Sequence, residues 1–203
     1  MRVFVAAVLL AAGAAEAQTP LLDAIAGGKE PVAAIMVLGG RADLEARNAA
    51  RETPLHLAAE KDMRAVTRLL LDAGARVRAR TATGETALHH AALNEDPEVA
   101  RLLLEAGADP RARNDHGESA LHWAAYGGNH AVARLLLERG ADADVFNLDG
   151  NLPLHGAAAG GHASTVRLLL PRTRHRGMQN LRGKTPRDLA RERGHDTVAA
   201  LLD

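Results

Sequence analysis

The chain has 203 residues, with 25 Lys+Arg balanced by 25 Asp+Glu, and it has no cysteine. The absence of cysteine excludes disulfide bonds, thiolate metal sites and a cysteine nucleophile. A net charge of zero creates no overall field toward nucleic acid or anionic lipid, so any electrostatic preference must come from local patches.

The N-terminal segment predicts an export signal. One positive charge, Arg2, precedes an apolar run from Val3 to Ala12, and Ala15-Glu16-Ala17 gives a small-x-small pattern. This order is typical of a secretory signal peptide, here residues 1–17, with cleavage before Gln18. The run is too short for a stable membrane span; the alternative is an uncleaved apolar helix. The alanine- and arginine-rich composition favours a bacterial source, so we expect a periplasmic or secreted protein.

Two short motifs return every 33 residues along the rest of the chain. The first reads TPLHLAA from Thr53, TALHHAA from Thr86, SALHWAA from Ser119 and LPLHGAA from Leu152, with a weaker copy from Lys184. The second reads LLLDAGA from Leu69, LLLEAGA from Leu102 and LLLERGA from Leu135. A fixed period of this length predicts a solenoid of stacked units.

Each unit is expected to contain two helices and an extended loop. The hydroxyl of Thr53 or its equivalent can cap the first helix, and apolar positions within Val66–Leu70 form one face of the second. Gly74, after the leucine run, can take the left-handed conformation that ends a helix. Gly84 marks the tip of the hairpin that leads to the next unit.

The pattern G-x-T-P-L-H-x-A-A followed by x-L-L-L-x-x-G-A-D resembles the ankyrin repeat, over nearly all of residues 20–203. The resemblance implies an all-α solenoid of stacked helix–turn–helix units with β-hairpin loops, in about six repeats. The repeat domain then spans residues 18–203, and its first and last units are degenerate caps. The units lie approximately at 18–51, 52–84, 85–117, 118–150, 151–183 and 184–203.

Four histidines share one motif position. In ankyrin repeats this histidine usually bonds the motif threonine and ties one unit to the next, so the resemblance implies a structural role. The structural set is Thr53, His56, Thr86, His89, Ser119, His122 and His155. Leu152 replaces the hydroxyl partner of His155, which predicts a looser fourth full unit.

The spacing of these histidines argues against a shared metal site. A zinc ion needs ligands at about 2 Å, whereas side chains separated by whole repeats lie roughly 10 Å apart. We therefore predict no catalytic residue, no metal and no cofactor. The alternative is a histidine-dependent hydrolase or metal-binding protein.

The resemblance implies a non-catalytic module that binds a protein through its concave groove and hairpin tips. Arginines recur before the tips at Arg47, Arg80 and Arg113, and Asp115 and His116 lie at the third tip. Such a row can bind carboxylates or phosphates, so it favours a protein partner with an acidic patch. Zero net charge and the export signal argue against the alternative of nucleic-acid binding. The row can also be a solvated edge balanced by acidic neighbours.

The three aromatic residues after the export signal, Trp123, Tyr126 and Phe146, fall in one unit. Trp123 and Tyr126 share one side of a helix, and such residues often carry interface energy, although Trp123 can equally belong to the core. Pro171 should shorten the second helix of the fifth unit. The arginine-rich loop that follows, 172–176, is either a decayed repeat or a contact for an acidic partner. We expect a monomer without a membrane span.

Overall fold

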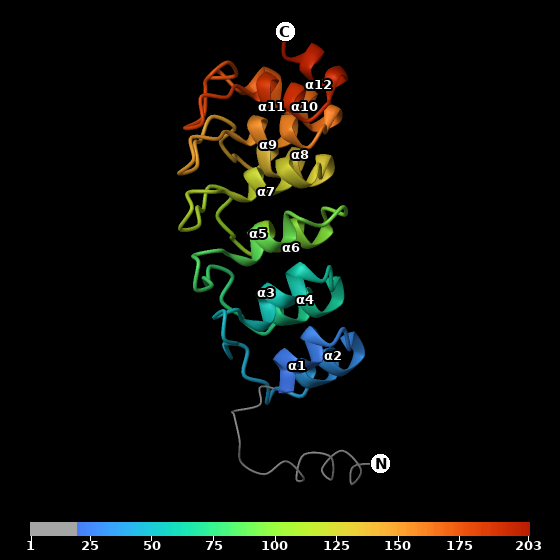
Figure 1. The fold of residues 1–203 in the computed structure, drawn as a ribbon. Coiled ribbons are helices and arrows are strands. Elements are labelled where there is room, and N and C mark those ends of the chain that lie inside the picture. The colour runs from blue at the N-terminus through green and yellow to red at the C-terminus, as the bar shows by residue number, and fades with distance from the viewer. Residues whose placement is uncertain (1–19) are drawn as a thin grey trace.

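The computed structural model describes residues 20–203, in which six helix pairs follow one another and stack into an elongated array (Figure 1). The first helices lie beside the long loops, and the second helices lie on the opposite side. The expected signal peptide, 1–17, lies outside the described residues. No helix within 20–203 is long and apolar enough to cross a membrane.

The helix bounds follow the repeat period. The first helices are α1 (Pro20–Ala26), α3 (Pro54–Glu60), α5 (Ala87–Ala91), α7 (Ala120–Gly127), α9 (Pro153–Ala159) and α11 (Pro186–Glu192). The second helices are α2 (Glu30–Leu38), α4 (Arg64–Asp72), α6 (Glu98–Glu105), α8 (His130–Glu138), α10 (Ala163–Leu169) and α12 (Asp196–Leu201). A 3₁₀ turn, η1 (Leu170–Arg172), follows α10.

One apolar core runs through the whole stack, from Leu21 to Ala199. The motif leucines are fully buried between neighbouring pairs, and burying each contributes roughly 2 kcal/mol. The small pair Ala58–Ala59 is also fully buried, which lets α3 approach α5 closely. Each unit therefore depends on its neighbours for most of its burial.

The start of the first helix differs from the expectation. Among the described residues, the Thr53 hydroxyl does not accept a bond from a helix N–H; it lies 2.8 Å from the Nδ1 of His56. Only in the last unit does the motif threonine cap the helix, since Thr185 Oγ1 accepts from the Asp188 backbone N–H at 3.1 Å. In the second, third and fourth units the hydroxyl of the motif threonine or serine instead donates to the Nδ1 of the motif histidine, at 2.8–3.0 Å. The end of the second helix is as expected, with Gly74 at a φ of +89°.

The loops are not regular β-hairpins. Within residues 20–203 the only β-bridge is an isolated one, between Arg113 and Ser119. Each loop instead closes on itself and bonds to the preceding loop. These inter-loop bonds run from the N–H of Ala82 to Ala50 O, Asp115 to Thr83 O, Leu148 to His116 O and Leu181 to Asp149 O, at 2.9–3.0 Å. The loops therefore form a continuous edge along one side of the array.

Pro171 shortens the fifth unit as expected, because α10 ends at Leu169 and passes into η1. The arginine-rich loop that follows is bound to the preceding unit. Arg174 Nε donates to Asp144 Oδ2 at 3.0 Å, and the backbone N–H of His175 donates to Asp144 Oδ1 at 3.1 Å. The Asp144 side chain is only 8% exposed. Burial would raise its pKa, but the N–H groups and side chains of Arg174 and His175 hold that pKa below its usual value.

Candidate binding surface

Each motif histidine bonds its own unit through Nδ1 and the next unit through Nε2. The Nδ1 of His56 accepts from the backbone N–H of Thr53 at 3.2 Å, and Nε2 lies 3.2 Å from Glu85 O in the next unit. Because an amide N–H only donates and a carbonyl only accepts, Nδ1 carries the lone pair and Nε2 carries the hydrogen. His89 and His122 repeat this geometry, with Nε2 at 3.1 Å from Glu118 O and Asn151 O.

These histidines are neutral at physiological pH. Burial lowers the pKa of His56, His89 and His122 from 6.5 to about 4. Since the lone pair and the hydrogen of each ring are both already used, no ring atom remains for an ion or for proton transfer. The side chains of His56, His89 and His122 therefore have a structural role, which is to link each unit to the next.

The fourth motif histidine retains part of this geometry. The backbone N–H of Leu152 still donates to His155 Nδ1 at 3.1 Å, although no hydroxyl is present. His155 Nε2 bonds Met178 O, 23 residues away, instead of a carbonyl 29 residues away. Leu152 itself is fully buried in the core, and this burial opposes the loss of the hydroxyl bond. The looser fourth full unit, residues 151–183, stays a prediction.

The arginine row connects units along the loop edge. Nη1 of Arg47 donates to Arg80 O at 2.8 Å, Nη1 of Arg80 to Arg113 O at 2.8 Å, and Nη2 of Arg113 to Phe146 O at 2.6 Å. Each of these bonds spans 33 residues. Each guanidinium also donates within its own loop, as Arg80 does to Gly84 O at 2.7 Å. The row is therefore partly committed to holding the loops together.

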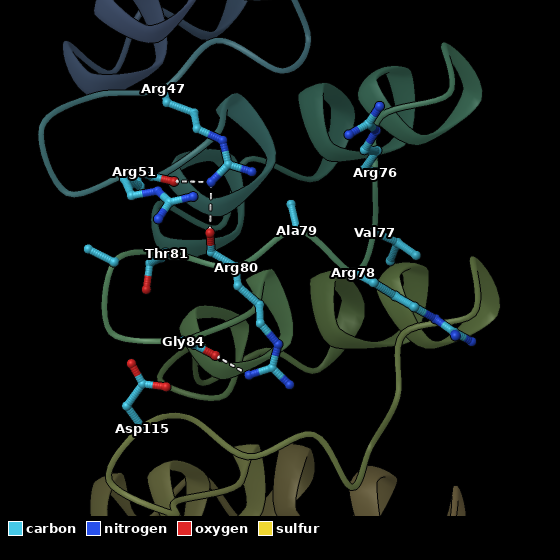
Figure 2. A pocket seen from close by; sticks show the side chains of 11 residues that line it. Arg47, Arg51, Arg76, Val77, Arg78, Ala79, Arg80, Thr81, Gly84 and Asp115 are labelled. Carbon is cyan, nitrogen blue, oxygen red and sulfur yellow. Dashed lines mark hydrogen bonds between the residues drawn. The ribbon is translucent and has the colours of Figure 1, made fainter.

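Five arginines of the first and second loops line a hollow of about 760 Å³, here called the arginine pocket, to which the third loop adds Asp115 (Figure 2). Its charged lining residues are Arg47, Arg51, Arg76, Arg78, Arg80 and Asp115. A guanidinium has five N–H donors, and Arg47 and Arg80 use only Nη1 in their bonds to the loops. The pocket thus retains an excess of positive charge beside the loop edge.

A second hollow of about 470 Å³, here called the aromatic groove, crosses α7, α9 and α11. Tyr126 and Leu93, which are 63% and 49% exposed, stand at its wall. Trp123 is half-buried: its Nε1–H donates to Glu118 Oε2 at 2.9 Å, and its ring packs 5.9 Å from that of His90. Trp123 therefore contributes both to the packing between units and to the groove.

The structure separates the predicted partner contacts. Arg47, Arg80 and Asp115 line the arginine pocket, while Trp123 and Tyr126 line the aromatic groove. Three others line neither hollow. Arg113 is bonded to its neighbouring loops, His116 is exposed at the third loop tip, and Phe146 is half-buried at 6.0 Å from the ring of His175.

Leu93 lines the groove but was not among the predicted partner contacts. It occupies the position equivalent to Tyr126, one repeat earlier, so the repeat register alone places the two side chains in adjacent units of the same wall. The 33-residue period could therefore have identified Leu93 from the position of Tyr126.

Comparison with protein families agrees with this geometry. An ankyrin repeat model matches residues 51–82, a model of three ankyrin repeat copies matches 76–147, and a model of many copies matches 136–190. Together these matches cover residues 51–190, and the chain belongs to the ankyrin repeat family. Repeats of this family are generally protein–protein interaction modules. A search of curated proteins found no match to this chain.

Proposed function

We propose that this protein binds a protein partner through the aromatic groove, with the arginine pocket as a second contact for acidic side chains. The observation that carries the proposal is the exposure of Tyr126 and Leu93 beside half-buried Trp123 in one hollow. Large aromatic side chains at the wall of a pocket commonly supply most of the energy of an interface.

The groove has the composition of a contact for a short segment of chain. Its apolar wall is bordered by the polar groups of Asn151, Arg182 and Arg193, which can bond the backbone of a bound segment. A volume of about 470 Å³ accommodates a few side chains, so an extended segment or helix end fits better than a broad flat surface.

The arginine pocket favours acidic groups on the same partner. Five guanidinium groups face a single carboxylate there, that of Asp115. Arg51, Arg76 and Arg78 extend the row that was recognised from sequence, and guanidinium groups bind carboxylates in paired, planar geometry.

We also propose that the protein is exported. Arg2, the apolar run that follows and the Ala15–Ala17 pattern support cleavage before Gln18. Such cleavage would leave every described helix in the mature protein, because α1 begins at Pro20.

The test is a pull-down from an extract of the exported proteins of the source organism, with the full chain as bait. A variant with Leu93→Ser and Tyr126→Ala removes the exposed groove side chains and leaves Trp123 and its bond to Glu118 in place. A matched control, Ile35→Ser with Leu38→Ser, removes two exposed apolar side chains from α2 instead.

A partner bound by the wild type and the α2 control, but lost from the groove variant, supports the proposal. A partner that binds all three proteins equally would place the contact elsewhere and reject the groove. An Arg51→Glu variant then reports on the arginine pocket, since the Arg51 side chain lines it and makes no hydrogen bond or ion pair with a neighbouring loop in the described structure.

A further inference from the structure

A second type of site lies between the second and third units. His90 in α5, Glu60 at the end of α3 and Glu52 just before α3 bring one imidazole nitrogen and two carboxylate oxygens within 4.8 Å of one another. Glu52 and Glu60 belong to the second unit, whereas His90 comes from the third, 30 residues beyond Glu60. Among the described residues, this is the one group of three or more such ligands with this spacing.

His90 differs from the motif histidines because its ring makes no hydrogen bond to any described residue. The residue is only 8% exposed, and its Nε2 is buried without a partner. Its Nδ1 lies 4.0 Å from Glu60 Oε2, which is too long for a hydrogen bond. Neither ring nitrogen of His90 therefore has a hydrogen-bond partner among the described residues, and the Nδ1 that faces Glu60 is free to take a ligand.

The ring is held in position by its neighbours. It packs edge-on against the His56 ring at 5.5 Å, and it lies 5.9 Å from the Trp123 ring in a tilted arrangement. One oxygen of Glu52 accepts from Asn48 Nδ2 at 2.6 Å, which orients that carboxylate. The Glu60 side chain is half-exposed, so it can move toward an ion.

We infer that His90, Glu52 and Glu60 form a binding site for a divalent cation of the zinc type. One imidazole and two carboxylates are ligands that zinc accepts, with a fourth position left for water or a partner side chain. Calcium and magnesium prefer oxygen ligands alone, so the central imidazole discriminates against them. The ligand atoms lie at most 4.8 Å apart and need to approach to about 3.5 Å, as tetrahedral coordination with bonds near 2.1 Å requires. This inference departs from the absence of a metal site that the sequence predicted.

The test is calorimetric titration of the full chain with Zn²⁺, after purification without a polyhistidine tag and treatment with a chelator. We expect one equivalent to bind and to raise the melting temperature, and Co²⁺ to show the visible spectrum of a site with nitrogen and oxygen ligands. His90→Leu should weaken binding by roughly a hundredfold or more. Leucine fits this position, because Leu57 occupies it in the preceding unit, so the variant should keep its fold and its metal-free melting temperature.

His130→Gln is the matched control, since His130 also has a ring nitrogen, Nδ1, that is buried without a partner, yet it belongs to no such ligand group. This variant should bind Zn²⁺ as the wild type does. Glu60→Gln should weaken binding without changing the fold. The inference is overturned by absence of saturable binding, by equal binding to His90→Leu, or by equal affinity for Ca²⁺.

Discussion

The guanidinium of Arg80 donates to the carbonyl oxygen of Arg113, 2.8 Å away and 33 residues further along the chain. The same Nη1 atom reaches Gly84 O within its own loop. One side chain thus fixes the shape of a loop and joins that loop to the next. The relationship recurs from Arg47 to Arg80 and from Arg113 to Phe146, so the repeat period itself generates it.

Replacing Arg80 should lower stability even though the side chain is exposed. Arg80→Met removes the charge-assisted bonds to Gly84 O and Arg113 O, at an expected cost of about 1–2 kcal/mol in the free energy of unfolding. Arg80→Lys should recover only part of this, because a flexible ammonium group is less well preorganised for both carbonyls. Urea titrations of the three proteins measure the difference. Equal midpoints would mean that the row contributes nothing to stability.

Stability should rise with pH between about 4 and 6.5. The pKa of His56, His89 and His122 is about 4 in the folded protein against an ordinary value of 6.5. In this window the unfolded chain binds more protons than the folded chain, so acidification favours unfolding, by up to about 1.4 kcal/mol per pH unit for each histidine. Denaturant unfolding at several pH values gives the slope. His89→Gln should reduce it, and an unchanged slope in that variant would contradict the assignment.

Arg51→Gly should stabilise the protein. Arg51 has a φ of +60° at a loop tip where the equivalent residues of the later units are glycines, such as Gly84 at +79°. Glycine adopts the left-handed conformation without strain, and the strain removed should exceed the cost of the more flexible unfolded chain. The free energy of unfolding should therefore rise by about 1 kcal/mol. The opposite change, Gly84→Ala, should destabilise, because a Cβ there would lie 3.1 Å from the Asp115 backbone nitrogen. Thermal unfolding of both variants checks the pair.

The C-terminal units should exchange amide hydrogens fastest. Leu152 gives His155 no hydroxyl, and α10 has 7 residues where α8 has 9. In a repeat array each unit depends mainly on its neighbours, so these defects should remain local. Hydrogen exchange followed by mass spectrometry resolves the units. Better protection of 150–203 than of 53–140 would disprove the prediction.

Export predicts a defined change in mass. Cleavage before Gln18 removes residues 1–17, and the mature protein should be found outside the cytoplasm. Ala17→Asp places a charged residue at the position that requires a small side chain and should leave the chain uncleaved. Intact-mass measurement of cell fractions compares the two proteins. A full-length wild-type chain in the cytoplasm would reject the proposal.

Sequence predicted contacts that lie inside one motif better than contacts between units. The threonine–histidine pair is only three residues apart, within one motif, and the resemblance to the ankyrin repeat implied the bond between Thr53 and His56. The direction of the Arg80 side chain depends on how two loops stack, and the same row was therefore interpreted as a partner contact. Glu52, Glu60 and His90 come from neighbouring units, and no linear motif indicates their proximity.

The residue at the histidine position of the last unit follows from the direction of these bonds. His56, His89 and His122 each donate forward to a carbonyl of the unit that follows. In the last described unit that position is Asp188, which accepts from the N–H and hydroxyl of Thr185 and has no donor to extend. The Asp188 carboxylate can only accept hydrogen bonds, so the series of bonds from each unit to the next ends here. An imidazole at this position would still have an N–H to donate. If a seventh unit were added by design, Asp188→His would supply an imidazole N–H that can bond a carbonyl oxygen of the added unit.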